Sequence, residues 1–154
     1  MDQVYSAYNP TAFSAATGAK TLIKIITPTS FNIKLHEFGV FFDGVTSSAV
    51  PATVDLFISD ETSAGTSGVT GTITQVKGAT LAHGCTIGTN FTAEGTTYTI
   101  LRSFYVPQFM GSLIIQNPLG LEDQTPAGLA DSIGIRVNTS ATVNVKGYMK
   151  FSRG

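Results

Sequence analysis

Hydrophobic and polar residues alternate along much of this chain, as they do in β-strands that bury one face. The alternation is strict over residues 52–59, 132–138 and 142–151. In the first of these segments Val54, Leu56 and Ile58 fall on one face. Further strands are predicted over residues 21–27, 32–42, 70–76, 97–106 and 112–116, with a weaker one near 81–87. The pattern therefore predicts about eight or nine strands and no long helix.

The segment 32–42 changes the phase of its alternation partway along. Its apolar residues are first Ile33 and Leu35, at odd positions, and then Phe38, Val40 and Phe42, at even positions. A shift of one residue moves every following side chain to the opposite face of a sheet. Unless both faces are covered, we expect a β-bulge near His36-Glu37 or Gly39 to restore the phase.

These strands predict an all-β fold in a single domain, because 154 residues is close to the usual size of one domain. The long and uneven connections favour a β-sandwich of the Greek-key or jelly-roll type over a simple meander. Residues 1–19 show no sustained period and are predicted to form an extended N-terminal arm. The β-sandwich is predicted over residues 20–154.

The predicted arm carries three large aromatic residues, Tyr5, Tyr8 and Phe13. An isolated arm cannot bury all three, and aromatic residues are enriched at interface hot spots. We therefore predict that they contact a neighbouring protomer or another partner protein. The alternative is that they pack back on their own domain as an extra edge strand.

A long connection over residues 117–131 is a second candidate for partner contact. It contains two prolines and three leucines, Leu119, Leu121 and Leu129. Loops of this length in compact domains are usually functional. The leucines are predicted either to plug the end of the sandwich or to contact a partner.

The polar residues of the chain are mostly uncharged. Asp, Glu, Lys and Arg make up 12% of the residues, and the formal net charge is −1. Because neutralising a nucleic-acid backbone needs clustered cations, we expect no nucleic-acid partner. No apolar run is long enough to span a bilayer and no secretory signal is visible, so a soluble protein made in the cytoplasm is expected. The single cysteine, Cys85, cannot form a disulfide within the chain.

The residues do not form a pattern typical of catalysis or cofactor binding. His83-Gly84-Cys85 brings two metal-ligating side chains together, but a zinc site needs three or four ligands. The acidic residues Asp43, Asp60, Glu61, Glu122 and Asp123 lie in predicted turns, where carboxylates usually cap the backbone. No nucleophile motif or phosphate-binding loop is present. We therefore expect no enzyme activity, no cofactor, no metal and no small-molecule substrate.

Two segments resemble parts of known proteins. The strand–turn–strand unit Leu35–Leu56 is similar to one in short all-β proteins encoded by tailed phages and prophages, and Ile133–Phe151 resembles their closing pair of strands. An aromatic N-terminal segment before a β-domain of this size also resembles the capsid decoration, or cement, proteins of tailed phages. This resemblance implies a jelly-roll-like protomer, a homotrimer, and binding between subunits of the major capsid protein on the outside of a virion.

Another function remains open from the residues alone. The chain could be a different β-module of a virion, such as the base of a spike or fibre, or a carbohydrate-binding jelly roll. In the carbohydrate-binding alternative, exposed tyrosines would stack on sugar rings. The candidates are Tyr5, Tyr98, Tyr105 and Tyr148.

Overall fold

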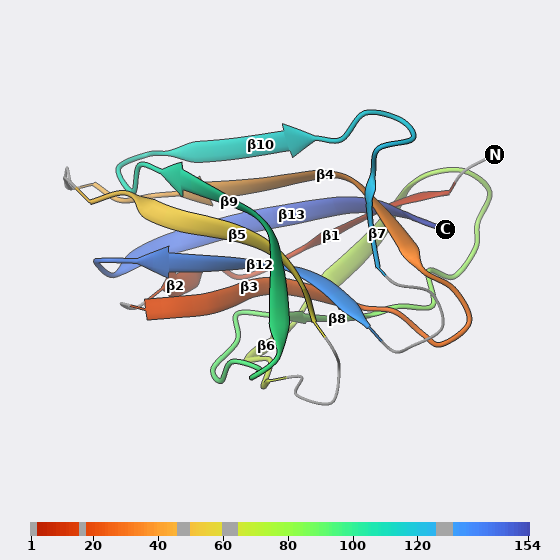
Figure 1. Cartoon of the computed structure of the whole chain (residues 1–154), viewed down its shortest axis with the longest axis horizontal. Coiled ribbons are helices and arrows are strands. Elements are labelled where there is room, and N and C mark those ends of the chain that lie inside the picture. The colour runs from red at the N-terminus through yellow and green to blue at the C-terminus, as the bar shows by residue number, and fades with distance from the viewer. Residues whose placement is uncertain (1–2, 16–17, 46–49, 60–64, 126–130) are drawn as a thin grey trace.

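The computed structural model is an all-β sandwich built from two antiparallel sheets (Figure 1). The structure describes residues 3–15, 18–45, 50–59, 65–125 and 131–154, which form thirteen strands. No helix that could cross a membrane occurs among these residues. The predicted all-β sandwich is confirmed.

Seven strands form one sheet, in which β10, β4, β13, β1 and β7 lie side by side in that order. β11 pairs with β4 and β2 pairs with β13. The strands of this seven-stranded sheet are β1 (Val4–Tyr8), β2 (Phe13–Ala15), β4 (Ile33–Phe42), β7 (Thr72–Lys77), β10 (Ser112–Gln116), β11 (Asp123–Gln124) and β13 (Val143–Arg153).

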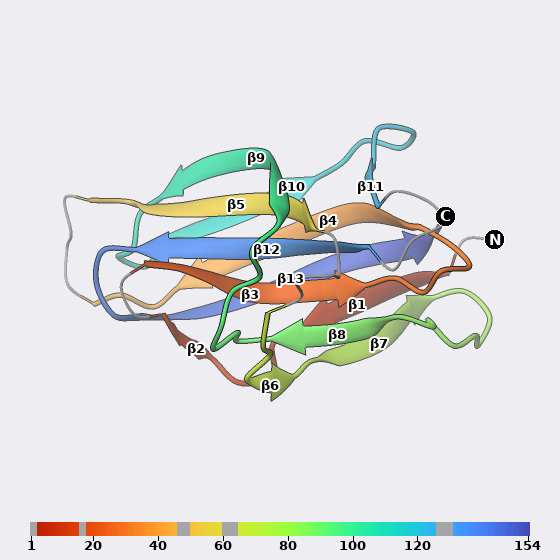
Figure 2. The ribbon, with the colours of Figure 1, turned by 60° about the horizontal axis from the view of Figure 1, so that its bottom comes forward.

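The other six strands form the second sheet, in the order β6, β8, β3, β12, β5 and β9. The two sheets stack face to face, as the two views in Figures 1 and 2 show. The strands of this six-stranded sheet are β3 (Gly18–Ile26), β5 (Ala52–Ser59), β6 (Val69–Thr70), β8 (Thr86–Thr89), β9 (Tyr98–Val106) and β12 (Ser132–Thr139).

The core lies between the two inner faces and follows the alternation in the sequence. Val54 and Leu56 of β5 are fully buried, as the pattern predicts. Asp55 and Phe57 on the other face of β5 are also buried, because Ser103 of β9 and Arg136 of β12 contact Asp55 and the ring of Tyr98 packs against Phe57. Period-two alternation therefore identified the strand but not the second layer over it.

The predicted bulge in β4 is confirmed at His36. Along β13, Lys150 pairs with Glu37 while the next residue, Phe151, pairs with Leu35. His36 is therefore the extra residue of β4 in this ladder. The bulge lets Leu35 and Phe38 both face the core, where both are fully buried.

The structure corrects the predicted N-terminal arm. Residues 4–8 form β1, which pairs with β13 on one side and with β7 on the other. Tyr5 is only 1% exposed, and its hydroxyl donates a hydrogen bond of 2.9 Å to the carbonyl oxygen of Leu81. The physical reason is that β1 supplies backbone partners for two strands and an aromatic side chain for the core. These five residues were too few for their alternation to be recognised.

Truncation of the two tyrosines of β1 should destabilise the protein to very different extents. We expect Tyr5→Ala to reduce the free energy of unfolding by about 3–5 kcal/mol, because it empties a buried aromatic site. Tyr8→Ala, at a side chain 39% exposed, should cost less than about 1 kcal/mol. Urea unfolding followed by tyrosine fluorescence measures both. Equal effects of the two variants would mean that Tyr5 is not part of the core.

Candidate interaction surface

The only pair of soft metal ligands close in the sequence, His83 and Cys85, forms a local turn. The Cys85 backbone N–H donates a hydrogen bond of 3.1 Å to His83 Nδ1. Burial raises the pKa of the Cys85 thiol to about 11, which keeps it protonated near neutral pH. Among the described residues, no group of three or more His, Cys, Asp or Glu is placed to hold a metal ion.

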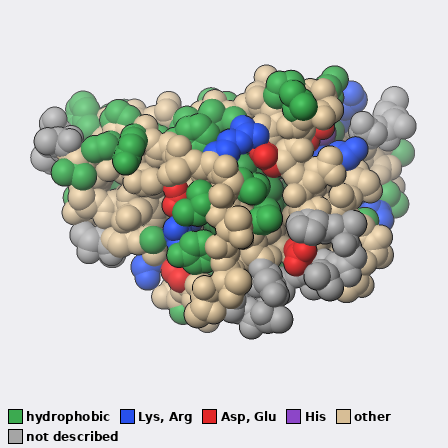
Figure 3. Space-filling view, viewed as in Figure 1, with side chains coloured by type: hydrophobic (Ala, Val, Ile, Leu, Met, Phe, Trp, Pro, Cys, Tyr) green, Lys and Arg blue, Asp and Glu red, His purple; other side chains and the backbone are tan. Residues whose placement is uncertain are grey.

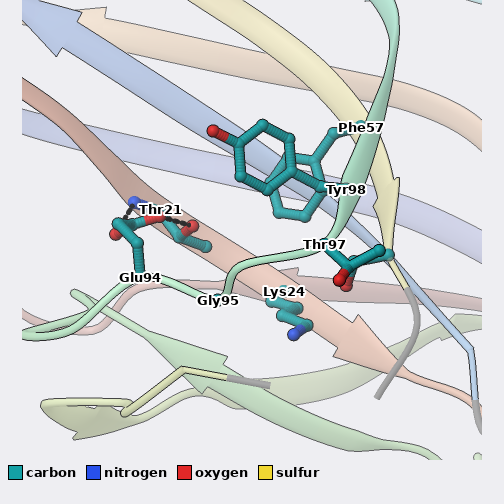
Figure 4. Close-up of a pocket in the computed structure, with 8 residues that line it drawn as sticks. Thr21, Lys24, Phe57, Glu94, Gly95, Thr97 and Tyr98 are labelled. Carbon is teal, nitrogen blue, oxygen red and sulfur yellow. Dashed lines mark hydrogen bonds between the residues drawn. The ribbon is translucent and has the colours of Figure 1, made fainter. Parts of the chain in front are cut away.

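Segment 90–98 closes over the outer face of the six-stranded sheet, leaving little space beneath it (Figure 4). The Glu94 carboxylate accepts hydrogen bonds from the backbone N–H and the hydroxyl of Thr21, at 2.7 and 2.6 Å. The space between this segment and β3 is about 10 Å³. That volume holds about one water molecule and is far too small for a substrate.

A buried ion pair lies on the same face. Arg136 Nη2 donates a hydrogen bond of 3.2 Å to Asp55 Oδ2, and the Ser103 hydroxyl donates to Asp55 Oδ1 at 2.6 Å. The ring of Tyr98 covers the Arg136 guanidinium, with 4.0 Å between guanidinium carbon and ring centroid. The Nη2 atom of Arg136 is thus paired, whereas its buried Nε has no hydrogen-bond partner among the described residues. The cluster joins β5, β9 and β12.

The outer face of the seven-stranded sheet carries a second cluster, around Tyr148. A Cβ at Gly39 would lie 2.4 Å from Tyr148 Cε1, so the ring rests directly on this glycine. The Tyr148 hydroxyl donates a hydrogen bond of 2.6 Å to Glu37, and Lys150 Nζ lies 2.8 Å from the same oxygen. The Lys150 hydrogen bond, and then that of Tyr148, lowers the pKa of Glu37. Desolvation and the bond to Glu37 raise the pKa of Tyr148 to about 12.

Exposed apolar side chains, in contrast, are concentrated in one part of the chain. Nine of the fifteen large ones among the described residues come from residues 98–121. These nine are Tyr98, Ile100, Leu101, Tyr105, Phe109, Met110, Ile114, Leu119 and Leu121. Large exposed apolar patches on soluble proteins usually mark interaction sites. Figure 3 shows several such groups along the upper rim of the molecule and at its left end.

One group of these residues lies at the end of the sandwich where β4, β9 and β12 end. We call this end the loop end; its exposed apolar residues are Val45, Val50, Tyr105, Phe109 and Met110. The loops that carry them are joined, since Gly44 bridges Phe109 and the Met110 N–H donates a hydrogen bond of 3.2 Å to the Gly44 carbonyl oxygen. The loop end is therefore a connected surface.

The buried residue Gln108 connects the loops of the loop end by hydrogen bonds from its side chain. Its side chain is 2% exposed, and its Nε2 donates hydrogen bonds of 2.8 Å to the Val50 carbonyl oxygen and to the Ser140 hydroxyl. These bonds connect the β9–β10 hairpin to two other loops. Asp43 is the only charged residue in the described parts of these loops, and its carboxylate accepts hydrogen bonds from Asn144. The described parts of the loop end are thus joined by hydrogen bonds and nearly uncharged.

The second group is the turn over residues 118–122, which we call the leucine turn. Its side chains Leu119 and Leu121 are 89% and 71% exposed. The leucines therefore do not plug the sandwich, and Leu129, for which the same alternative was considered, lies outside the described residues. Gly120 has a φ of 85°, a conformation that glycine adopts without strain.

Both ends of the leucine turn are anchored. Before the turn, the Asn117 backbone N–H donates a hydrogen bond of 2.7 Å to the His36 carbonyl oxygen. The Asn117 side-chain Nδ2 donates one of 2.8 Å to the Leu35 carbonyl oxygen. After it, Asp123 accepts a hydrogen bond of 2.6 Å from Arg102 of β9. Within it, backbone N–H groups donate to Glu122 and lower the pKa of that carboxyl group. The hydrogen bonds on both sides of the turn therefore keep the two leucine side chains exposed to solvent.

The remaining predicted contact residues are dispersed. Tyr8 is exposed on the outer face of the seven-stranded sheet, and Phe13 of β2 is partly buried against the core. Contact of Tyr8, Phe13, Leu119 and Leu121 with a partner stays a prediction. Of the four tyrosines considered for sugar stacking, Tyr5 is buried and two are engaged in the clusters above, which leaves Tyr105.

Of the five loop-end residues, the sequence pattern singled out only Tyr105, as a candidate for sugar stacking; Val45, Val50, Phe109 and Met110 were not identified. The segment Pro107–Gly111 places Phe109 and Met110 between a proline and a glycine, where a polar turn is usual. Large apolar residues in a predicted turn were therefore the one feature of the sequence that could have indicated this surface. The contributions of Val45 and Val50 required the fold, because they are far from the hairpin in the sequence.

Comparisons with known proteins gave weak structural matches. No family model matches the chain, and no curated protein is significantly similar to it. A structure of the T13 viral particle of infectious bursal disease virus is similar with 15% identity and a TM-score of 0.26, over 99% of this chain and 39% of that one. A mutant VP2 protein of the same virus, from T=1 particles, gives 15% identity and a TM-score of 0.25, over 99% and 40%. The chain spans about two fifths of the length of these capsid proteins, and TM-scores this low carry no argument about function.

The exposure of the leucine turn can be tested on the isolated protein. We expect Leu121→Ser to change the free energy of unfolding by less than about 0.5 kcal/mol, because the side chain is already in water. Thermal unfolding of the variant and the wild type measures this. A loss of several kcal/mol would show that Leu121 plugs the sandwich.

The environment of Cys85 predicts an unreactive thiol. With a pKa of about 11, only about one molecule in a thousand carries the thiolate at pH 8. We therefore expect maleimide labelling to be roughly a hundredfold slower than that of a free thiol. Unfolding in urea should restore the normal rate. Fast labelling of the folded protein would contradict this placement of Cys85.

Proposed function

We propose that this chain is a structural virion protein that decorates the outside of a capsid by binding to major capsid subunits. It acts by binding alone, through the loop end. The observation that carries this proposal is the set of five exposed apolar side chains at one end of the sandwich, whose described loops carry one charged residue, Asp43. An enzyme would instead need a cleft with converging titratable groups.

The chemistry of the loop end suits contact with another protein. Phe109, Met110 and Tyr105 supply aromatic and methionine side chains, which are enriched at protein interfaces. A partner that packs on this end desolvates few charged groups. Desolvation therefore offsets little of the free energy gained by burying the apolar side chains. Gln108 joins the described parts of these loops by hydrogen bonds, and contacts that exist before binding lower the conformational entropy that binding costs.

The resemblance to tailed-phage decoration proteins supports the choice of a capsid as partner. The two segments that carry it, Leu35–Leu56 and Ile133–Phe151, are the units β4–β5 and β12–β13. Both units turn at the loop end, where the proposed contact lies (Figure 1). The described ends of the chain lie at the opposite end of the sandwich, so a protomer bound by its loop end directs them away from the shell.

Co-sedimentation with tailed-phage shells that lack the protein tests the proposal. We expect the wild type to pellet with the shells and Phe109→Ser to bind at least about tenfold more weakly, as for an interface hot spot. Ile114→Ser is the matched control, because Ile114 is exposed to a similar extent, 56% against 50% for Phe109, but lies on β10 outside the loop end.

Two results would overturn the proposal. One is binding that Phe109→Ser and Ile114→Ser reduce equally, which would remove the loop end as the contact. The other is failure of the wild type to bind shells together with binding to saccharides that is lost in Tyr105→Ser. That outcome would favour the carbohydrate-binding module.

A further inference from the structure

A hollow lies beside the loop end, on the outer face of the six-stranded sheet. Its volume is about 310 Å³, which is at the lower end of the range for small-ligand sites. β9, β5 and β12 lie side by side in that order here, as Figure 2 shows. Each of these strands supplies one side chain to the hollow, namely Tyr105, Thr53 and Asn138, and Pro51 and Ser140 also line it.

The strand register brings the first three of these side chains into one row. Thr53 pairs with Tyr105 of β9 on one side and with Asn138 of β12 on the other. Residues directly opposite each other in antiparallel strands have Cβ atoms roughly 5 Å apart on the same face of the sheet. The following or preceding residues Val54 and Val137 are fully buried in the core. Because successive side chains alternate between faces, the row points outward.

The neighbouring row of the same face is already closed. Two residues away along each strand, Asp55 accepts hydrogen bonds from Ser103 and Arg136, and the ring of Tyr98 covers the Arg136 guanidinium. The charges of that row are therefore paired with each other. Among the described residues, no charged side chain lines the hollow itself.

The polar groups of the open row have no partners in the protein. The side chains of Tyr105, Thr53 and Asn138 make no hydrogen bond within the described part of the chain, and Tyr105 is 80% exposed. The other sheet differs in this respect, because there the Tyr148 hydroxyl donates to Glu37. The hollow thus offers an aromatic ring, an amide and a hydroxyl group to a ligand.

We propose that this hollow binds a neutral pyranose of a glycan. A pyranose has a ring face of C–H groups that stacks on an aromatic side chain, and its hydroxyl groups both donate and accept hydrogen bonds. Tyr105 stacks on the C–H face, while the Asn138 amide and the Thr53 hydroxyl bond to sugar hydroxyl groups. The Ser140 hydroxyl already accepts a hydrogen bond from Gln108, and its O–H remains a donor for the ligand.

The lining also selects the kind of sugar. An acidic sugar would bring a carboxylate into a hollow where no described side chain carries a positive charge to pair with it. Desolvating an unpaired charge is costly, so a neutral sugar is favoured. The chemistry of the lining residues therefore identifies the ligand as an uncharged ring with several hydroxyl groups.

The inference goes beyond the proposed function and does not depend on it. A shell that carries many copies of the protein would present many weak glycan sites, and their avidity would hold the particle on a glycan-coated surface. Tyr105 belongs to the loop end as well as to the hollow. Variants at Asn138 and Phe109 therefore separate glycan binding from shell binding.

NMR titration of the ¹⁵N-labelled protein tests the inference. The probes, added separately, are methyl β-D-glucopyranoside, methyl β-D-galactopyranoside, methyl α-D-mannopyranoside and N-acetyl-D-glucosamine. We expect at least one of them to shift the backbone amide signals of Thr53, Tyr105 and Asn138 in a saturable way. The expected Kd is about 1–10 mM, as for a small ligand with few contacts. N-acetylneuraminic acid, an acidic sugar, should bind at least about tenfold more weakly.

Variants on the two sheets provide the matched comparison. We expect Tyr105→Ser and Asn138→Ala each to weaken binding of the sugar at least about tenfold, and Thr53→Val, which removes only a hydroxyl group, to weaken it about threefold. Tyr8→Ser and Thr72→Val are the controls, because they change a tyrosine and a threonine that pair with each other on the outer face of the other sheet. Both controls should keep the wild-type Kd, and the spectrum of each variant shows that it is folded.

Three results would overturn the inference. They are the lack of a saturable shift with any of the neutral sugars at about 50 mM, binding that Asn138→Ala leaves unchanged, and tighter binding of the acidic sugar. Each would leave the proposed function standing if the wild type still pelleted with shells in a manner that depends on Phe109. Conversely, Phe109→Ser should lose shell binding and keep the wild-type Kd for the sugar.

Discussion

The packing of the two inner sheet faces against each other determines the positions of the loop end and of the leucine turn. β13 pairs with β4 and β1 in the middle of one sheet, and β12 pairs with β3 and β5 in the middle of the other. Met149 of β13 and Ile135 of β12 are fully buried between the sheets, and each such side chain stabilises the fold by about 1.5–3 kcal/mol. Because these two strands follow one another in the chain, their connection at the loop end is tied directly to the core.

Some of the few charged side chains connect neighbouring strands. Asp55 pairs with Arg136 and Glu37 pairs with Lys150, each pair joining neighbouring strands on an outer face. The loop end and the leucine turn, in contrast, expose apolar side chains. Such surfaces bind through shape and burial, and this is the physical link between an uncharged composition and an assembly role.

Much of the fold could be predicted from the sequence because alternation reports directly on burial. Residues 52–59 and 112–116 coincide with β5 and β10. The phase change in β4 predicted a bulge near His36-Glu37 or Gly39, and the structure has it at His36. β1 was missed because Tyr5 and Ala7 give too short a pattern, although hydrogen bonds on both sides make it an interior strand. The short strands β6 and β11 depend on their partners, β8 and β4, and not on their own residues.

The interaction surfaces were less predictable, for a physical reason. The sequence of a loop does not show whether a leucine in it is buried or exposed. The hydrogen bonds of Asn117 and Asp123 in the folded structure are what keep Leu119 exposed. The loop end combines residues from segments about 60 positions apart, which no local pattern brings together. Exposure depends on the whole fold, whereas strand formation depends on neighbours in the sequence.

A cryo-electron microscopy map of a shell decorated with this protein would test the central claim most directly. The account predicts that each sandwich stands on the shell with Phe109 and Met110 in contact with capsid subunits and with Gly154 pointing outward. A map in which the loop end faces solvent, or in which the outer face of a sheet lies flat on the shell, would contradict it.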